Sequence, residues 1–77
     1  MNNRETMNIY AGAGHKVKVT KETAKNGYDN DIAKVHEHLI IGHEYTVLIN
    51  TVGYTESRVL LKEIPHVFFN TVNFVDA

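Results

Sequence analysis

The absence of cysteine from a chain of only 77 residues is its strongest constraint, because neither a disulfide nor a thiolate-bound metal can supplement the core. A folded chain of this size buries roughly 60% of the surface that its unfolded form exposes, which leaves room for one small core. We therefore expect a single small domain from a reducing compartment, stabilised further by self-association.

Periodic apolar side chains predict one helix among several strands. The expected elements are strands over 15–20, 44–50, 57–63 and 67–75 and a helix over 30–41. Pro65 cannot donate a ladder hydrogen bond, so it should interrupt pairing before the last strand. The order β-α-β-β-β predicts an α+β fold in which one helix packs on a strongly curved antiparallel sheet or a partly open small barrel.

Residues 1–14 are expected to form a flexible N-terminal arm outside the folded domain of residues 15–77, because small and polar residues dominate this segment. Ile9 and Tyr10 are apolar exceptions within it. They could add a short strand to the sheet of a neighbouring subunit.

Polar and glycine residues mark both ends of the expected helix. Asp29 or Asn30 can accept hydrogen bonds from its free N–H groups, and Asp31 favours the positive end of its dipole. Gly42 follows the last apolar position, where a left-handed C-cap is favoured. These roles explain Asp29 and Asp31 better than a catalytic carboxylate pair does.

Charge and hydropathy argue against several kinds of partner. Eight basic and nine acidic residues give a formal charge of −1, which argues against a dedicated nucleic-acid binder. The longest apolar run, Leu39–Ile41, is far shorter than the roughly 20 residues that span a bilayer. Residues 1–6 lack the pattern of a signal peptide. We expect a cytoplasmic protein without a membrane segment.

The five histidines do not form a recognisable metal site. His36 and His38 are two positions apart, so on a helix they point about 200° away from each other, whereas helical zinc ligands are usually four apart. Nothing in the sequence brings His15, His43 or His66 to them. We expect neither a metal nor another cofactor, and interpret His36 and His38 as favourable charges at the helix C-terminus when protonated.

Catalytic motifs are equally hard to support. Residues 11–16 resemble a phosphate loop superficially, but they lack its spacing and lead into a strand instead of a helix. Ser57 is the only serine and has no evident Ser-His-carboxylate partners. We therefore expect a protein that is not an enzyme.

Three residues could contact a ligand. Tyr54 lies in the expected hairpin loop, where burial is not required, so it could stack on a planar group. Arg58 and Lys62 fall on one face of the third expected strand and could together hold a phosphate or carboxylate group. A solvated outer sheet face explains these two basic residues as well.

Five short motifs in a fixed order resemble a known group of small proteins. They are N-G-Y at 26–28, G-x-x-Y-T-V at 42–47, V-G at 52–53, L-x-E-x-P at 61–65 and F-N-T-V-x-F at 69–74. The chain resembles, over residues 16–75, a group of small phage and bacterial proteins that carry this pattern. The resemblance implies a phage or mobile-element origin and supplies no catalytic residues.

Small phage proteins of this kind frequently counter host defence, and two hypotheses follow from the resemblance. In the first, the protein sequesters a nucleotide second messenger in a pocket between subunits in the host cytosol. Arg58 and Lys62 would then meet phosphates, Tyr54 or Tyr28 would stack on the base, and Asn70 or Asp31 would bond ribose hydroxyls. In the alternative, the protein blocks a defence protein, such as a CRISPR effector, through a sheet edge or the loop 51–56.

The last expected strand suggests a homo-oligomer. Phe68, Val72 and Phe74 face one side of it and Phe69 the other, and one short helix cannot cover both faces of a flat sheet. We therefore expect Phe68 or Phe69 at or near a subunit interface.

Overall fold

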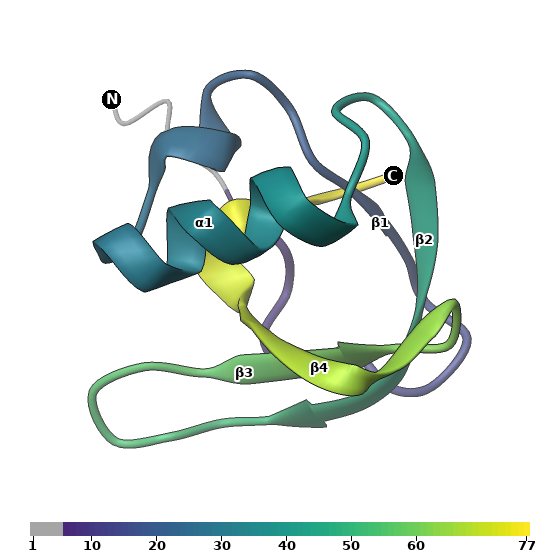
Figure 1. The fold of residues 1–77 in the computed structure, drawn as a ribbon. Helices are drawn as coiled ribbons and strands as arrows, with labels where there is room; N and C mark the ends of the chain where they lie inside the picture. The colour runs from purple at the N-terminus through teal and green to yellow at the C-terminus, as the bar shows by residue number, and fades with distance from the viewer. Residues whose placement is uncertain (1–5) are drawn as a thin grey trace, which may run out of the picture.

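The computed structural model describes residues 6–77, in which one helix packs against an antiparallel five-stranded sheet. The elements, in chain order, are β1 (Lys16–Lys18), the 3₁₀ turn η1 (Thr23–Lys25), α1 (Asp29–His38), β2 (Glu44–Thr51), β3 (Arg58–Leu61), β4 (Ile64–Asn70), the 3₁₀ turn η2 (Thr71–Asn73) and β5 (Val75–Asp76). Figure 1 shows α1 lying across one side of the sheet. The predicted α+β class is confirmed.

The strand order is β4-β3-β2-β1-β5, and β2 joins the two parts of the sheet. Its first residues pair with β1, as in Val17 opposite Tyr45, and its last residues pair with β3, as in Thr51 opposite Arg58. The short β5 pairs with β1, which places the C-terminus beside the first strand.

The sheet is neither closed nor strongly curled, so the predicted barrel-like curvature is wrong. Closure would require the edge strands β4 and β5 to pair, but the turn η2 separates them in the chain. Asn73 at the end of η2 donates side-chain hydrogen bonds to the carbonyls of Thr23 and Asn26, at 2.9 and 3.0 Å. This bonding ties η2 to η1, while β4 and β5 lie at opposite edges of the sheet.

The same turn divides the strand predicted over 67–75. Strand β4 begins earlier, at Ile64, and ends at Asn70, whose side chain accepts a hydrogen bond from the Val72 N–H at 3.2 Å. This side-chain cap favours a 3₁₀ turn over further extension. Pro65 lies inside β4, between the paired residues Ile64 and Phe68, where the ladder shifts register. Pairing is therefore irregular around Pro65, as predicted, but the prediction that the strand begins only after Pro65 is wrong.

Helix α1 is shorter than the predicted 30–41. Leu39 is already extended, and the N–H of Ile40 is bonded to the Tyr45 hydroxyl at 2.9 Å instead of continuing the helix. Gly42 has the expected positive φ of 92°, but in the turn before β2, where its N–H donates to the carbonyl of Val19. No helix within residues 6–77 has the length and apolar character needed to cross a membrane.

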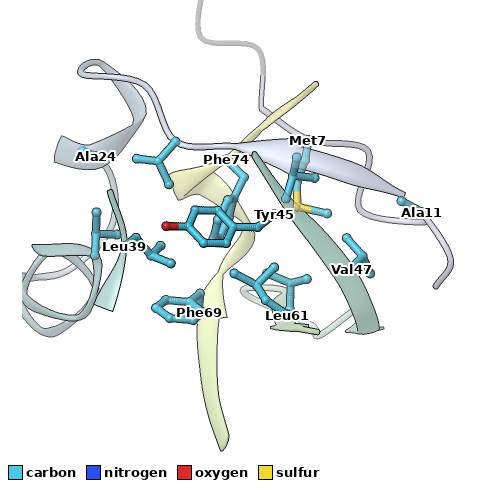
Figure 2. Packing of buried hydrophobic residues seen from close by; sticks show 13 residues of the cluster. Met7, Ala11, Ala24, Leu39, Tyr45, Val47, Leu61, Phe69 and Phe74 are labelled. Atoms are coloured by element: carbon cyan, nitrogen blue, oxygen red, sulfur yellow. The ribbon is translucent and has the colours of Figure 1, made fainter. Parts of the chain in front are cut away.

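The core lies between α1 and the facing side of the sheet (Figure 2). Phe69 and Phe74 pack edge to face at its centre, with ring centroids 6.0 Å apart. Met7 and Ala11 also belong to this core, and the Met7 N–H donates to the carbonyl of Phe74 at 2.8 Å. The folded domain thus extends into the segment expected to be an arm, whose residues 1–5 lie outside the described residues.

Both edges of the sheet are protected against pairing with another chain. On β4, Pro65 lacks an N–H, and Lys34 from α1 donates to the Phe68 carbonyl at 3.1 Å. On the other side, β5 has only two residues, and Asp76 accepts the N–H of Asn8. Short edges, proline and covering side chains are the usual devices that prevent edge-to-edge association.

The C-terminal strand is held by an exposed carboxylate. Asp76 Oδ1 lies 2.7 Å from His15 Nε2 and 3.1 Å from the N–H of Asn8. Partial burial acts to raise the pKa of Asp76, but the hydrogen bonds from His15 and Asn8 outweigh it and hold the pKa below its ordinary 3.8.

We expect Asp76→Asn to lower the urea midpoint of unfolding at about pH 6 and to have a much smaller effect at about pH 2. A carboxyl group whose folded-state pKa is lowered stabilises the fold above its unfolded-state pKa, and this contribution disappears as the pH falls through the folded-state pKa. Circular dichroism at both pH values measures the difference, and an equal difference at both would contradict the assigned role of Asp76.

Candidate functional site

A cleft of about 540 Å³ opens beside the start of α1, within the ~300–1,000 Å³ range of small-molecule sites. Residues from four segments line it: the N-terminal segment, the turn before α1, the end of the β2–β3 loop, and the β4–η2 junction. They are Thr6, Asn26, Gly27, Tyr28, Thr55, Glu56, Ser57, Asn70 and Val72.

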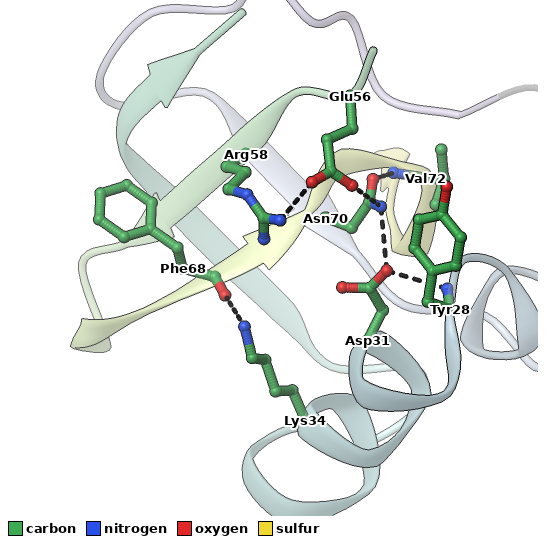
Figure 3. A network of polar contacts seen from close by, with 8 residues as sticks. All are labelled: Tyr28, Asp31, Lys34, Glu56, Arg58, Phe68, Asn70 and Val72. Carbon is green, nitrogen blue, oxygen red and sulfur yellow. Dashed lines mark hydrogen bonds and ion pairs between the residues drawn. The ribbon is translucent and has the colours of Figure 1, made fainter. Parts of the chain in front are cut away.

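Asn70 connects helix α1, the end of the β2–β3 loop and the turn η2 (Figure 3). Its buried side-chain amide donates to Asp31 Oδ2 at 3.1 Å and approaches Glu56 Oε1 at 3.4 Å. Its Oδ1 accepts the N–H of Val72. One side chain therefore sets the relative positions of helix, loop and 3₁₀ turn.

Asp31 lies behind Asn70, outside the set of residues that line the cleft, and it also fixes the start of the helix. Its side chain is only 2% exposed, and Oδ2 accepts the N–H of Tyr28, the N-cap residue, at 2.9 Å. Its other oxygen, Oδ1, is buried without a hydrogen-bond partner among the described residues. Asp31 therefore lies in the first turn of the helix, as predicted. The expected caps Asp29 and Asn30 instead lie inside the helix, and Tyr28 occupies the N-cap.

Two glycines allow the close packing around the cleft. Gly27 has a φ of 89°, and a Cβ there would lie 2.8 Å from Asp31 Oδ2. A Cβ on Gly53 would lie 2.1 Å from the backbone oxygen of Glu56, so the β2–β3 loop folds tightly over itself. Any larger residue at either position would displace the carboxylate or the loop.

The charges at the cleft are largely paired within the protein. Arg58 forms an ion pair with Glu56 Oε2, and both side chains are about one-third exposed, at 38% and 28%. Figure 3 shows the Arg58 guanidinium directed at Glu56. Because Arg58 is engaged, it is not a free anion-binding group.

The opposite face of the sheet from the core carries an exposed apolar row. Ile49, Leu60 and Phe68 are directly opposite each other on β2, β3 and β4, so their side chains share one face. Ile49 is 51% exposed and Phe68 42%, while Leu60 lies buried between them. We call these residues the outer row. The next row of paired residues on the same face consists of Thr51, Arg58 and Asn70. This row ends at the cleft, because Asn70 lines it.

The exposure of Ile49 departs from the predicted alternation, which placed it with Tyr45 and Val47. The register shifts between Val47 and Ile49, and this irregularity turns Ile49 away from the core. Phe69, by contrast, is only 1% exposed and belongs to the core of a single chain, so it does not lie on a free surface.

The structure brings four of the six predicted ligand-binding residues together. Tyr28 and Asn70 line the cleft, with Asp31 and Arg58 bonded to its walls. Lys62 lies beyond the end of β3, in the turn to β4, and is not among the residues that line the cleft. The two-point grip of Arg58 and Lys62 on one anion stays a prediction.

Tyr54 stands apart from the cleft at the tip of the β2–β3 loop, where it is fully exposed. Sequence reasoning missed Glu56, which pairs with Arg58 and lines the cleft. Only its position two residues before Arg58 could have indicated it. No group of three or more metal-ligating side chains occurs within residues 6–77.

A family model described as Bacteriophage T4 protein Y07B matches residues 4–76. The chain belongs to this phage protein family. The match covers both the cleft and the outer row and extends the resemblance noted over 16–75, so the expected phage relationship is confirmed. Neither a curated protein nor a solved structure matches the chain.

Proposed function

We propose that this member of a phage family is a non-enzymatic accessory protein that counters host defence in the host cytosol by binding and blocking a defence protein. The observation that carries the proposal is the outer row, an in-register apolar surface of Ile49, Leu60 and Phe68 on three adjacent strands. Exposed contiguous apolar surface in a small protein usually marks an interaction site.

The neighbouring loop extends this surface. Val52 and Tyr54 are both exposed in the β2–β3 loop, and the close approach of Gly53 to Glu56 restricts the loop's shape. An exposed tyrosine on a restricted loop binds with little loss of conformational entropy, which is typical of interface hot spots. Because both sheet edges are protected, the face and the loop suit a partner better than the edges do.

We expect Phe68→Ser combined with Ile49→Thr to abolish binding to the defence partner while leaving the fold intact. The experiment isolates complexes of the tagged protein from infected cells, reconstitutes each with purified components, and measures affinity and inhibition of the partner's activity. Truncating central apolar contacts should weaken affinity by at least about 30-fold, equivalent to roughly 2 kcal/mol.

Tyr10→Ser provides a matched control, because Tyr10 is exposed but lies outside the outer row and the loop. It should bind as the wild type does. A double variant that retains full affinity, or a reconstituted partner whose activity is unchanged, would refute the proposal.

Nucleotide sequestration by a homo-oligomer is the second candidate, favoured by the cleft's volume and by Tyr28 at its wall. The cleft is open, so a second subunit would have to enclose the ligand and supply cations for its phosphates, because Arg58 is already paired. Mass spectrometry of the natively purified protein separates the two candidates: a bound nucleotide in a symmetric oligomer favours sequestration, whereas a ligand-free monomer favours protein blocking.

A further inference from the structure

We infer that the cleft accepts an arginine side chain of the blocked protein, with Glu56 pairing with its guanidinium and Tyr28 stacking against it. This inference rests on the proposed function and specifies the chemistry of the partner. The partner surface would combine apolar residues, which cover the outer row, with one arginine that enters the cleft.

The charge around the cleft favours a cation. Glu56 and Asp31 contribute two carboxylates that are joined through the Asn70 amide, and Arg58 pairs with only the first of them. Lys34 is engaged elsewhere, with the carbonyl of Phe68 at 3.1 Å. This group of Asp31, Glu56 and Arg58 therefore keeps a net negative charge, which favours a cation.

Glu56 has unused hydrogen-bonding capacity. Arg58 binds Oε2, whereas Oε1 makes, among residues 6–77, only the long 3.4 Å contact with Asn70. A carboxylate oxygen has two acceptor positions, so Oε1 can accept a charge-assisted hydrogen bond from a second guanidinium. The cleft also contains Ser57 and Thr55, whose hydroxyl groups can accept further N–H donors.

The exposed ring of Tyr28 lines the same cleft as Glu56 and Val72 and offers an aromatic surface there. Arginine stacks on aromatic faces while its N–H groups bond a carboxylate, and lysine does so less well. An anionic group would instead meet Glu56 and the acidic first turn of α1, which carries Asp29 and Asp31.

The cleft also lies beside the outer row. The pair Arg58–Asn70 is the next same-face row after Leu60–Phe68, at two residues or about 7 Å along the strands. One partner segment can therefore place an apolar side chain on the outer row and an arginine in the cleft.

The test titrates the ¹⁵N-labelled protein with N-acetyl-arginine amide and with N-acetyl-citrulline amide, its neutral isostere, at low ionic strength. We expect arginine to shift the amide signals of Gly27, Tyr28, Glu56 and Ser57 and to bind at least about fivefold more tightly than citrulline. Glu56→Gln should remove this preference, because it deletes the carboxylate while keeping the side chain's shape. Glu37→Gln, an exposed carboxylate at the other end of α1, should keep it.

Equal binding of both amides, or signals that shift only away from the cleft, would overturn the inference. Tighter binding of adenosine monophosphate than of the arginine amide would also overturn it and would favour the nucleotide candidate. These outcomes are separable from failure of the proposed function, since Phe68→Ser with Ile49→Thr tests the outer row without altering the cleft residues.

Discussion

Phe69→Ala is expected to destabilise the protein by about 3–5 kcal/mol, the usual cost of deleting a fully buried phenylalanine side chain. A domain of this size has a free energy of unfolding of roughly 4–12 kcal/mol, so this one change should leave the fold marginal at room temperature. Phe69 packs against Phe74 and against the ring of His38, and its removal leaves a cavity at the centre of the core. Urea denaturation followed by circular dichroism measures the loss.

Phe68→Ala is the matched control, because it removes the same group from the adjacent residue on the opposite face of β4. Phe68 is 42% exposed, and its truncation should cost less than about 1 kcal/mol. Similar destabilisation by the two changes would contradict the assignment of Phe69 to the core and of Phe68 to the outer row. Comparing the two variants therefore separates the contribution of Phe69 to folding stability from the contribution of Phe68 to partner binding.

Asp31→Ala is expected to cost about 2–4 kcal/mol, the second-largest effect. About 1 kcal/mol comes from losing the side-chain cap on the Tyr28 N–H. A further ~1–3 kcal/mol comes from the buried Asn70 amide, which loses its 3.1 Å bond to Asp31 and keeps the longer 3.4 Å contact with Glu56. Thermal unfolding measures the loss of stability. Amide hydrogen exchange should accelerate at Tyr28, whose N–H loses its acceptor, and at Val72, because Asn70 then holds the β4–η2 junction less firmly.

Asp29→Ala tests whether the destabilisation expected for Asp31→Ala depends on the position of the carboxylate and not on its charge alone. Asp29 also lies in the first turn of α1, but it is exposed, so its loss should cost only the ~0.3–1 kcal/mol of a helix-dipole interaction. Equal effects of the two aspartates would show that Asp31 acts through the dipole and that the Asn70 bond contributes nothing.

Together these residues explain how so small a protein can hold two neighbouring surfaces in a fixed arrangement. Asn70 lies in the ladder row next to the outer row, and its side chain also forms part of the cleft wall. Binding surfaces built on strands keep their geometry better than surfaces built on loops. A partner that contacts both surfaces would therefore meet a rigid template.

The order of the main elements could be predicted from periodicity alone. Val17 and Val19 alternate with polar residues as a strand requires, and the apolar spacing before Gly42 is helical, so both elements appear close to the predicted positions. Such patterns reflect which face of each segment is buried, and that preference acts locally along the chain.

The candidate site was predictable only in part. Tyr28, Asp31 and Asn70 were identified individually, but the prediction that Arg58 acts with Lys62 assumed an uninterrupted strand. Strand β3 ends at Leu61, after a register shift, and Lys62 lies in a turn. The pairing of Arg58 with Glu56 depends on the tight loop around Gly53, which no periodic pattern reveals.

The sequence by itself determined the size of the core, the α+β class and the burial of alternating apolar residues, because these depend on composition and on local periods. Only the tertiary structure decided which surfaces are free. The register shift in β2 turned Ile49 outward, the Asn70 cap ended β4, and α1 placed Asp31 behind Asn70. Each of these depends on contacts between residues far apart in the chain, and hydrogen bonds and bulges of that kind leave no periodic signal in the sequence.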